Sequence, residues 1–346
     1  MSSPGAASRW ARRARTVAVV GGATSLVAGG TAAVAIASSR SRRRTRIERS
    51  DPSGPAGARL PDGRSLVVTT DDGAHLAVTV AGPDDGPTVV LAHCWTGSRA
   101  TWASVARRLA GGGHRVVLYD QRGHGQSTNA DAIPSIPMLG HDLRAVLEAT
   151  DSHDAVLVGH SMGGMTIQSY AMEHPDHFAD RARAVVLVAT ASRTLGRAVP
   201  SRVIHGALGE GSREWTRRGR VGRAMVRGSI GQQPRRAHID LTLETFAATT
   251  GTARAGYLLA MLAMDLRPCL EQITVPATVM VGTRDRLTPP RLARQLAASL
   301  PDAELVVLPG SGHMLPLEEP DRIIDAIGRT SGRASPSSAA RAARSR

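Results

Sequence analysis

The sequence of 346 residues contains no lysine, only two cysteines and few aromatic residues. The absence of lysine excludes Schiff-base chemistry, which requires a side-chain amine. Cys94 and Cys269 are too few and too far apart for a disulfide framework or a zinc site, so we expect two free thiols. Aromatic residues make up 3% of a chain that is 42% apolar, so aliphatic side chains must supply most of the core.

Acidic residues are fewer than arginines, and the formal net charge is +14. The excess lies at the two ends: residues 1–50 carry ten arginines and one acid, and residues 329–346 carry five arginines and no acid. Residues 51–328 are neutral, with 28 basic and 28 acidic side chains. A neutral body argues against an extended phosphate-binding surface, so we expect no nucleic-acid partner. The basic N-terminal arm, residues 1–15, fits contact with anionic lipid, and an arginine-rich composition explains it equally well.

Residues 16–39 carry no formal charge and are rich in glycine and alanine. As a helix this segment would be about 36 Å long, enough to cross a hydrocarbon core of about 30 Å. The sequence therefore predicts a transmembrane helix that acts as a single-pass N-terminal anchor. Small residues recur at every fourth position, a spacing that would let two membrane helices pair as a dimer; they are Gly21, Ser25, Gly29, Ala33 and Ala37.

A cleavable signal peptide, followed by secretion, is the alternative interpretation of this segment. The arginine-rich start and the Ala35-Ile36-Ala37 triplet favour it. The five arginines between positions 40 and 46 argue against it, because they would resist translocation at the start of a mature chain. Arginines flank both ends of the segment, so the positive-inside rule favours a cytoplasmic location of the neutral body of the chain only slightly. We expect residues 40–63 to be a linker and residues 329–346 to be a disordered basic tail.

Between residues 64 and 328, short apolar β-branched runs alternate with helical periodicity. Such runs are typical of strands buried on both faces of a sheet. The expected strands are 65–70, 75–80, 88–93, 115–119, 155–159, 184–189, 277–282 and 304–308. The first two are separated by Asp71-Asp72-Gly73 and should form an antiparallel hairpin at the sheet edge. The pattern predicts an α/β fold, with a mostly parallel central sheet and helices on both faces.

The alternation stops between residues 191 and 270, where helical stretches at 239–250 and 256–264 replace strands. An all-helical insertion in an α/β sheet is typical of a cap over an active site. The core would then consist of residues 64–190 and 271–328. Residues 193–236 hold eleven arginines against two glutamates, which predicts a basic side of the cap or simply a solvated polar face.

The strongest chemical motif is Gly159-His160-Ser161-Met162-Gly163, placed between an apolar run and a helical stretch. A Gly-x-Ser-x-Gly sequence at a sharp strand-to-helix turn presents the serine as a nucleophile. Both glycines are needed because side chains there would collide with neighbouring backbone. The sequence therefore predicts Ser161 as the nucleophile.

A serine hydroxyl is inert at neutral pH unless a base removes its proton. His313 lies in the glycine-rich loop after the last expected strand, and Asp285 follows the strand before it. Asp285 would hold the imidazole in the tautomer that accepts the serine proton. Loop aspartates also cap helices, and the chain has twelve histidines, but three such residues at consecutive strand ends predict a catalytic triad.

A tetrahedral intermediate needs two backbone N–H donors. The amide of Met162 is one candidate, and the loop His93-Cys94-Trp95-Thr96-Gly97 offers the amide of Trp95 as the other. With the segment Asp120-Gln121-Arg122-Gly123-His124-Gly125-Gln126-Ser127, these motifs resemble the α/β-hydrolase superfamily over about residues 60–328. Members of that superfamily usually carry glycine where this chain has Cys94.

We expect the Cys94 side chain, in place of glycine, to alter the turn or to narrow the acyl side of the substrate pocket. We expect Cys94, Trp95 and His160 to border that pocket. A catalytic thiol at Cys94 is the weaker alternative, because the elbow serine is the better nucleophile. His93 and Arg122 are expected to brace loops rather than to take part in chemistry.

The resemblance implies the α/β-hydrolase fold with a helical cap and a serine esterase or lipase-like activity. Ser161 would form an acyl-enzyme with a carboxylic ester or a related acyl compound, a small-molecule or lipid-like substrate. No metal or organic cofactor is implied. Relatives that open epoxides or remove halides use aspartate at the elbow, so Ser161 argues against both. An acyltransferase or a cofactor-free perhydrolase on the same triad, and a non-catalytic binding protein on the same fold, are the alternatives.

Overall fold

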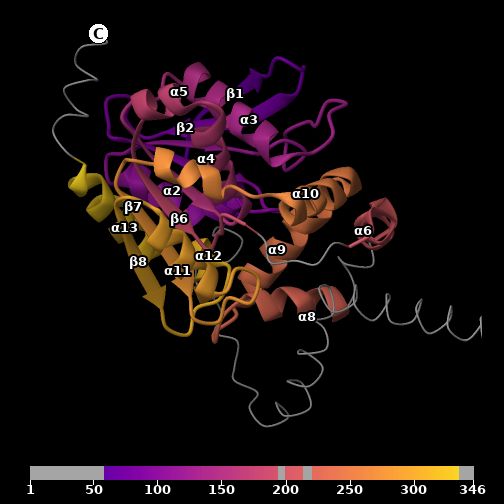
Figure 1. The fold of residues 1–346 in the computed structure, drawn as a ribbon. Coiled ribbons are helices and arrows are strands. Elements are labelled where there is room, and N and C mark those ends of the chain that lie inside the picture. The colour runs from indigo at the N-terminus through magenta and orange to yellow at the C-terminus, as the bar shows by residue number, and fades with distance from the viewer. Residues whose placement is uncertain (1–57, 194–198, 213–219, 335–346) are drawn as a thin grey trace, which may run out of the picture.

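The computed structural model describes residues 58–193, 199–212 and 220–334 (Figure 1). The basic arm 1–15, the segment 16–39 and residues 40–57 of the linker lie outside the described residues. The predictions of a membrane anchor, a signal peptide and helix-mediated dimerisation therefore concern parts of the chain that are not described. Within the described ranges, no helix combines the length and the apolar character that a membrane span requires.

A twisted sheet of eight strands forms the centre of the described molecule, in the order β1-β2-β4-β3-β5-β6-β7-β8. Its strands are β1 Gly63–Thr69, β2 His75–Ala81, β3 Thr88–Ala92, β4 Arg115–Tyr119, β5 Ala155–His160, β6 Ala182–Val188, β7 Ala277–Gly282 and β8 Ala303–Leu308. β1 and β2 form an antiparallel hairpin at one edge, β2 pairs antiparallel with β4, and all other pairs are parallel. The mostly parallel sheet and the edge hairpin are confirmed, and each predicted strand lies within two residues of the observed one.

Helices cover both faces of the sheet because its strands alternate their apolar side chains between two cores. Val90 and Ala92 of β3 belong to one core, and Val89 and Leu91 belong to the other. The first core packs against α3 (Ile136–Ala149), α4 (Met162–Glu173), α5 (Pro175–Arg181) and α11 (Pro290–Ser299). The second packs against η2 (Arg99–Trp102), α2 (Ala103–Gly111), α12 (Leu315–Glu318) and α13 (Pro320–Arg333). The α/β sandwich predicted from the sequence is therefore confirmed.

The last helix, α13, corrects the predicted start of the C-terminal tail. Residues 329–333 were expected in a disordered tail, but α13 continues to Arg333. Thr330 is fully buried, and its hydroxyl lies 2.6 Å from that of Thr278 in β7. The Arg333 guanidinium donates to the Asp302 carboxylate at 2.8 Å. These contacts with the sheet hold the final turn in place despite its polar sequence.

An insertion follows β6 and returns the chain to β7. It contains α6 (Ser201–Leu208), η3 (Glu210–Ser212), α8 (Arg220–Ser229), α9 (Arg236–Ala248), α10 (Gly251–Ala263) and η4 (Arg267–Gln272). The Leu266 amide donates to the Ser192 carbonyl at 2.7 Å, and Arg193 and Asp265 form an antiparallel bridge, so the two ends of the insertion are joined. The described part of the insertion contains no strand of the sheet, as the sequence predicts, although α9 and α10 begin three to five residues earlier than expected.

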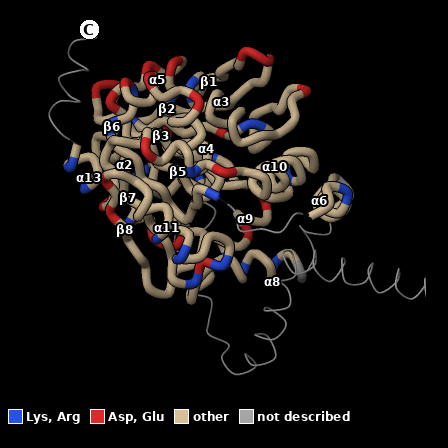
Figure 2. Tube along the Cα trace, in the orientation of Figure 1, with Lys and Arg blue, Asp and Glu red and all other residues tan. Residues whose placement is uncertain are grey.

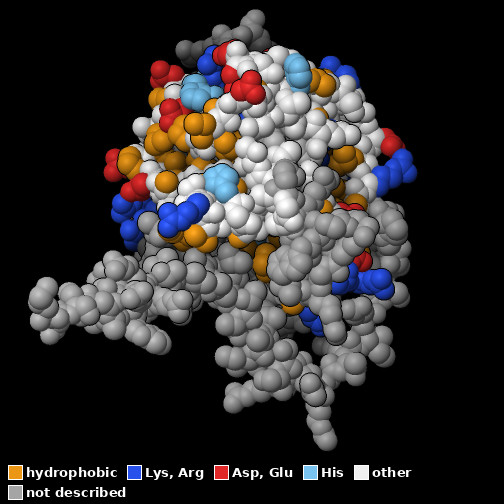
Figure 3. Space-filling view, turned by 90° about the vertical axis from the view of Figure 1, so that its right-hand side faces the viewer, with side chains coloured by type: hydrophobic (Ala, Val, Ile, Leu, Met, Phe, Trp, Pro, Cys, Tyr) orange, Lys and Arg blue, Asp and Glu red, His pale blue; other side chains and the backbone are white. Residues whose placement is uncertain are grey.

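The insertion helices gather on one side of the molecule (Figure 1). Leu258, Leu259 and Leu262 of α10 are only partly buried. The side that carries the insertion exposes hydrophobic side chains among uncharged ones (Figure 3). Acidic and basic residues are interspersed along the described chain (Figure 2). On the insertion itself, Asp240 pairs with Arg223 and Arg236, which offsets part of its positive charge.

Candidate active site

Ser161 occupies a strained turn between β5 and α4. Its φ of 53° and ψ of −113° lie outside the regions that a residue with a side chain ordinarily adopts. The Ser161 amide donates to the Val188 carbonyl at 2.9 Å, and the Thr190 hydroxyl donates to the Ser161 carbonyl at 2.7 Å. Strain of this kind persists only where surrounding contacts over-determine the backbone, and it concentrates at functional sites.

The glycines on either side of Ser161 are required by close backbone contacts. A Cβ on Gly159 would lie 2.4 Å from the carbonyl oxygen of Gly163. A Cβ on Gly163 would lie 2.2 Å from the carbonyl oxygen of Ala92, at the end of β3. Both distances are far inside van der Waals contact. The turn therefore packs directly against the loop that begins at His93.

His313 and Asp285 form a buried hydrogen-bonded pair. The Nδ1 atom of His313 lies 2.9 Å from Oδ2 of Asp285. The other carboxylate oxygen accepts the amides of Leu287 and Thr288, at 2.8 and 2.9 Å, and the Thr288 hydroxyl donates to Oδ2 at 2.8 Å. Burial alone would raise the pKa of Asp285, but the charge interaction with His313 and these hydrogen bonds outweigh it and lower the pKa. An ionised carboxylate can only accept, so Nδ1 carries the proton and Nε2 can take another.

The loop that carries His313 lies against the turn that carries Ser161. His160, directly before Ser161, donates from Nε2 to the His313 carbonyl at 2.8 Å. The two imidazole rings are 5.1 Å apart. Ser161 and His313 are 8% and 4% exposed, so the predicted nucleophile and the predicted base are both buried. Asp285 is bonded to the base, and His160 joins the Ser161 turn to the His313 loop, but within the described ranges no hydrogen bond links the Ser161 hydroxyl to the His313 imidazole.

The two amides predicted to bind an oxyanion lack acceptors. Met162 is the first residue of α4, where an amide has no partner within its own helix. Within the described part of the chain, neither the Met162 amide nor the Trp95 amide donates a hydrogen bond. The Trp95 loop is tightly turned: the Gly97 amide donates to the Cys94 carbonyl at 3.0 Å, and Thr96 has a φ of 56°.

His93 and Arg122 brace loops around this region, as expected. The Gln121 amide donates to Nε2 of His93 at 2.8 Å, so Nδ1 holds the proton and donates to the Cys94 carbonyl at 2.8 Å. Arg122 is buried and binds Asp142 through Nε at 2.9 Å. These bonds fix the loops after β3 and β4 without placing either side chain at Ser161.

Cys94 is buried under the insertion and is not poised as a nucleophile. Burial raises the pKa of its thiol to about 12, so the reactive thiolate is scarce at neutral pH. The side chain belongs to an apolar cluster with residues of α8 and α9 and with the neighbour of His313; the other members are Val226, Ile230, Ile239, Leu243 and Met314. The cluster joins the loop after β3 to the insertion.

The other two predicted pocket residues have different surroundings. The Trp95 indole donates to the Arg254 carbonyl of α10 at 3.1 Å and makes an edge contact with Phe246 of α9 at 6.2 Å. His160 is fully buried, beside His313 and Trp102. Burial, followed by the nearby His313 charge, lowers its pKa to about 3. Trp95 therefore faces the insertion, whereas His160 lies behind His313.

Three groups around the candidate site were not identified from the sequence. Thr288 binds Asp285, Glu318 accepts the amide of Gly312, and the carbonyl of Ser229 accepts the amide of His313 at 2.7 Å. Thr288 and Glu318 lie three and five residues from predicted triad members, a spacing that could have drawn attention to them. A backbone carbonyl such as that of Ser229 carries no sequence signal.

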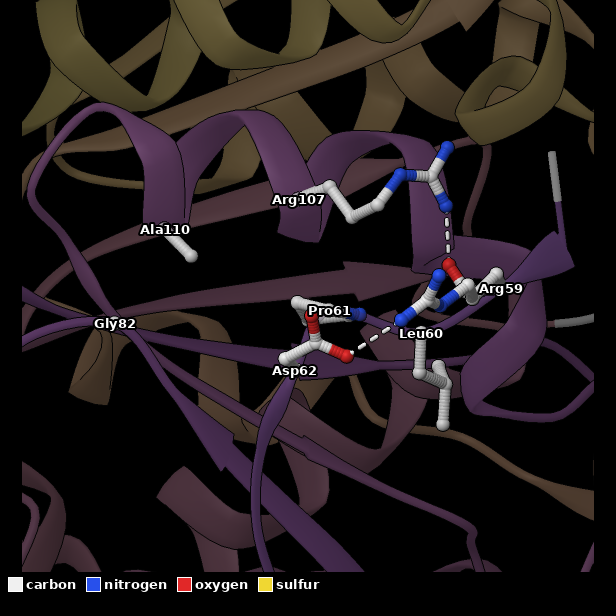
Figure 4. Close-up of a pocket in the computed structure, with 7 residues that line it drawn as sticks. All are labelled: Arg59, Leu60, Pro61, Asp62, Gly82, Arg107 and Ala110. Carbon is white, nitrogen blue, oxygen red and sulfur yellow. Dashed lines mark hydrogen bonds and ion pairs between the residues drawn. The ribbon is translucent and has the colours of Figure 1, made fainter. Parts of the chain in front are cut away.

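The cavity drawn in Figure 4 belongs to another part of the molecule. It has a volume of about 600 Å³ and lies between the start of β1 and α2. Residues such as Leu60 and Arg107 line it, and none of its lining residues comes from the loops of Ser161, Asp285 or His313. We assign no role to it.

The chain is similar to known hydrolases over most of its length. A family model described as "Alpha/beta hydrolase family" matches residues 89–326. The putative carbamate hydrolase RutD of Variovorax paradoxus is 31% identical over 241 residues, which cover 68% of this chain and 87% of that protein. The bifunctional esterase/perhydrolase DCH of Acinetobacter calcoaceticus is 26% identical over 290 residues, covering 74% and 95%. The crystal structure of a hydrolase from Pseudomonas aeruginosa PA01 superposes with a TM-score of 0.65 at 25% identity, covering 78% of this chain and 99% of that one.

Proposed function

Because the chain belongs to the alpha/beta hydrolase family, we propose that it is a serine hydrolase that forms an acyl-enzyme on Ser161. Its substrate would be a carboxylic ester or a related acyl compound. The observation that carries the proposal is the bond of 2.9 Å between His313 and Asp285, in a loop that is itself bonded to the residue before Ser161. A nucleophile, a base and an orienting carboxylate are the parts that acyl transfer requires.

In the first half of the reaction, Nε2 of His313 removes the Ser161 proton as the hydroxyl oxygen attacks the acyl carbonyl carbon. Asp285 keeps the proton on Nδ1 and stabilises the imidazolium that forms. The imidazolium then protonates the leaving alcohol as the carbon–oxygen bond breaks. In the second half, His313 takes a proton from water as the water oxygen attacks the carbonyl carbon of the acyl-enzyme. The imidazolium then returns this proton to the Ser161 oxygen as the acyl–oxygen bond breaks, which releases the acid and the free serine.

The amides of Met162 and Trp95 would stabilise the negative oxygen of each tetrahedral intermediate. Both are available, since they donate to no other group among the described residues. The positive end of the α4 dipole would add to the same field. Removing one such donor in other hydrolases costs about 3 kcal/mol of transition-state stabilisation.

The apolar surroundings support an uncharged acyl group. Cys94 packs against the apolar side chains of Val226, Ile239 and Met314. Burying a carboxylate against such a surface would be costly without a paired cation. Cys94 and Trp95 would then border the substrate, and p-nitrophenyl esters of increasing chain length should show a preference set by this cluster.

A fluorophosphonate probe tests the proposal directly. The probe should label the purified protein at Ser161, and Ser161→Ala should abolish both labelling and ester hydrolysis. Trypsin digestion and mass spectrometry would locate the adduct. Absence of labelling in the folded wild-type chain would favour a non-catalytic binding protein. Labelling that persists in Ser161→Ala would show that Ser161 is not the nucleophile.

Perhydrolysis is a second candidate, favoured by the similarity to a protein named as a bifunctional esterase/perhydrolase. Hydrogen peroxide would replace water in the second half, so that the acyl-enzyme yields a peracid and free Ser161. An alcohol in the same position would make the protein an acyltransferase. Product analysis with water, peroxide and alcohols in competition separates the three outcomes.

A further inference from the structure

The insertion touches the His313 loop through a short turn between α8 and α9, residues 229–232. The Ser229 carbonyl accepts the His313 amide at 2.7 Å, and the Gln232 amide donates to the Gly310 carbonyl at 3.0 Å. A Cβ on Gly231 would lie 2.3 Å from that same carbonyl oxygen. The backbones of the 229–232 turn and the His313 loop are therefore in direct contact.

A single carboxylate oxygen joins these two backbones. Oε2 of Glu318 accepts the amide of Gly231 at 2.7 Å and the amide of Gly312 at 2.9 Å. Gly231 belongs to the insertion, and Gly312 directly precedes His313. Glu318 itself ends α12, which packs on the core. The side chain thus ties the insertion, the His313 loop and the core together at one point.

Burying the Glu318 carboxylate in this position costs free energy. Oε1 is buried and has no hydrogen-bond partner among the described residues. Burial raises the pKa of Glu318, although the amides of Gly312 and Gly231 lower it in part. Burying a carboxylate is unfavourable unless its bonds compensate, so the amides that it holds are its principal stabilising contacts.

The backbone of His313 is consequently held from two sides. The insertion binds its amide through Ser229, and His160 of the Ser161 turn binds its carbonyl. We propose that Glu318 is a positioning residue, which sets the His313 imidazole between Asp285 and Ser161 by fixing the 229–232 turn to Gly312. The proposal rests on the proposed function, and it makes the insertion a support of the base as well as a cover for the substrate.

Glu318→Ala and Glu318→Gln test the proposal. Alanine leaves both amides without an acceptor, so the base should shift, and shifts of about 1 Å reduce catalysis by about 100-fold. We expect kcat and the rate of fluorophosphonate labelling to fall by about 100-fold, with KM changing less than about threefold. Glutamine retains an oxygen that can accept both amides and should keep rates within about fivefold of wild type.

Asp321→Ala is the matched control, because it removes an exposed carboxylate of α13 that pairs only with Arg108 in the described residues. It should label at the wild-type rate. Thermal unfolding of each variant separates loss of fold from loss of positioning. A folded Glu318→Ala that labels at the wild-type rate would overturn the proposal, and so would equal losses in the alanine and glutamine variants.

Gly231→Ala provides a second route if Glu318→Ala does not fold. Its Cβ would push the turn away from Gly310 while leaving the carboxylate intact. A folded protein with slow labelling supports the proposal, and one with normal labelling contradicts it. If neither variant folds, the contact is purely structural and the positioning role fails. In every case the Ser161→Ala comparison reports separately on the proposed function.

Discussion

The side chain of Asp285 is saturated with donors. Its oxygens accept the amides of Leu287 and Thr288, the Thr288 hydroxyl and the His313 imidazole. In Asp285→Asn an amide group would face these donors, so the imidazole would turn or adopt the wrong tautomer. We expect kcat to fall by about 10⁴, as in serine hydrolases with the same replacement. Steady-state hydrolysis of a p-nitrophenyl ester measures the change.

Asp302→Asn is a suitable control, because Asp302 is a half-exposed partner of Arg333. Asp285→Asn should also change how the free energy of unfolding depends on pH in acid. The folded-state pKa of Asp285 lies below its ordinary value of 3.8, so its stabilising contribution is present above that value and is lost as pH falls through the folded pKa. A kcat within tenfold of wild type would contradict the orienting role of Asp285.

The two thiols should be unreactive in the native protein. Burial raises the pKa of both Cys94 and Cys269 to about 12. At pH 8 the thiolate fraction is therefore very small, and alkylation needs the thiolate. Iodoacetamide should add no mass to the folded protein and two adducts after denaturation, as measured by intact mass. Rapid alkylation of Cys94 in the native protein would contradict this prediction and would support a chemical role for that thiol.

At the scale of elements, the Ser161 turn depends on glycine in a way that ordinary helix positions do not. Gly163→Ala would place a Cβ 2.2 Å from a backbone oxygen of β3, and backbone cannot move aside cheaply. We expect a loss of several kcal/mol of folding free energy, the range of the most damaging single substitutions. Chemical unfolding monitored by circular dichroism would measure it.

Gly328→Ala in α13 is the matched comparison. A Cβ there meets nothing within 4 Å, and alanine is favoured over glycine inside a helix by about 1 kcal/mol. The two Gly-to-Ala changes should therefore have opposite signs. Equal effects at both positions would show that contact with β3 is not what demands glycine at the turn.

The elements that the sequence predicts well are those with a local signal. The strands from β3 to β7 are short apolar runs because both of their faces are buried, and the Ser161 turn has a fixed pattern of small residues. Contacts between distant segments have no such signal. The carbonyl of Ser229 binds His313 whatever its side chain, so the sequence could not indicate that the insertion supports the base.

Helix ends were also less predictable than strands. α13 continues through Arg333 because Thr330 and Arg333 contact the neighbouring strands, although the local composition is that of a polar tail. α9 begins at Arg236, in a stretch whose arginines predicted a basic side of the cap or a solvated polar face. At the end of α13, tertiary contacts therefore override weak local propensity.

At the scale of the whole molecule, imidazoles are buried without charge at several positions that are far apart in the sequence. Among the described residues, burial lowers the pKa of His93 to about 4 and those of His124 and His160 to about 3. Each donates one ring N–H to a backbone carbonyl, those of Cys94, Arg122 and His313 respectively. The neutral tautomers thus hold together the loops after β3 and β4 and the loop of the base.

These imidazoles should make the fold sensitive to mild acid. Unfolding returns each one to a pKa near 6.5, so the unfolded chain binds more protons below that pH. Their contribution to stability is complete above pH 6.5 and falls toward the folded values, by about 1.4 kcal/mol per pH unit for each imidazole. Together they predict a decline of about 4 kcal/mol between pH 6 and 5, where most carboxylates do not yet titrate. Urea unfolding at these pH values measures the slope. A free energy of unfolding that is constant over this interval would mean that these imidazoles titrate alike in both states.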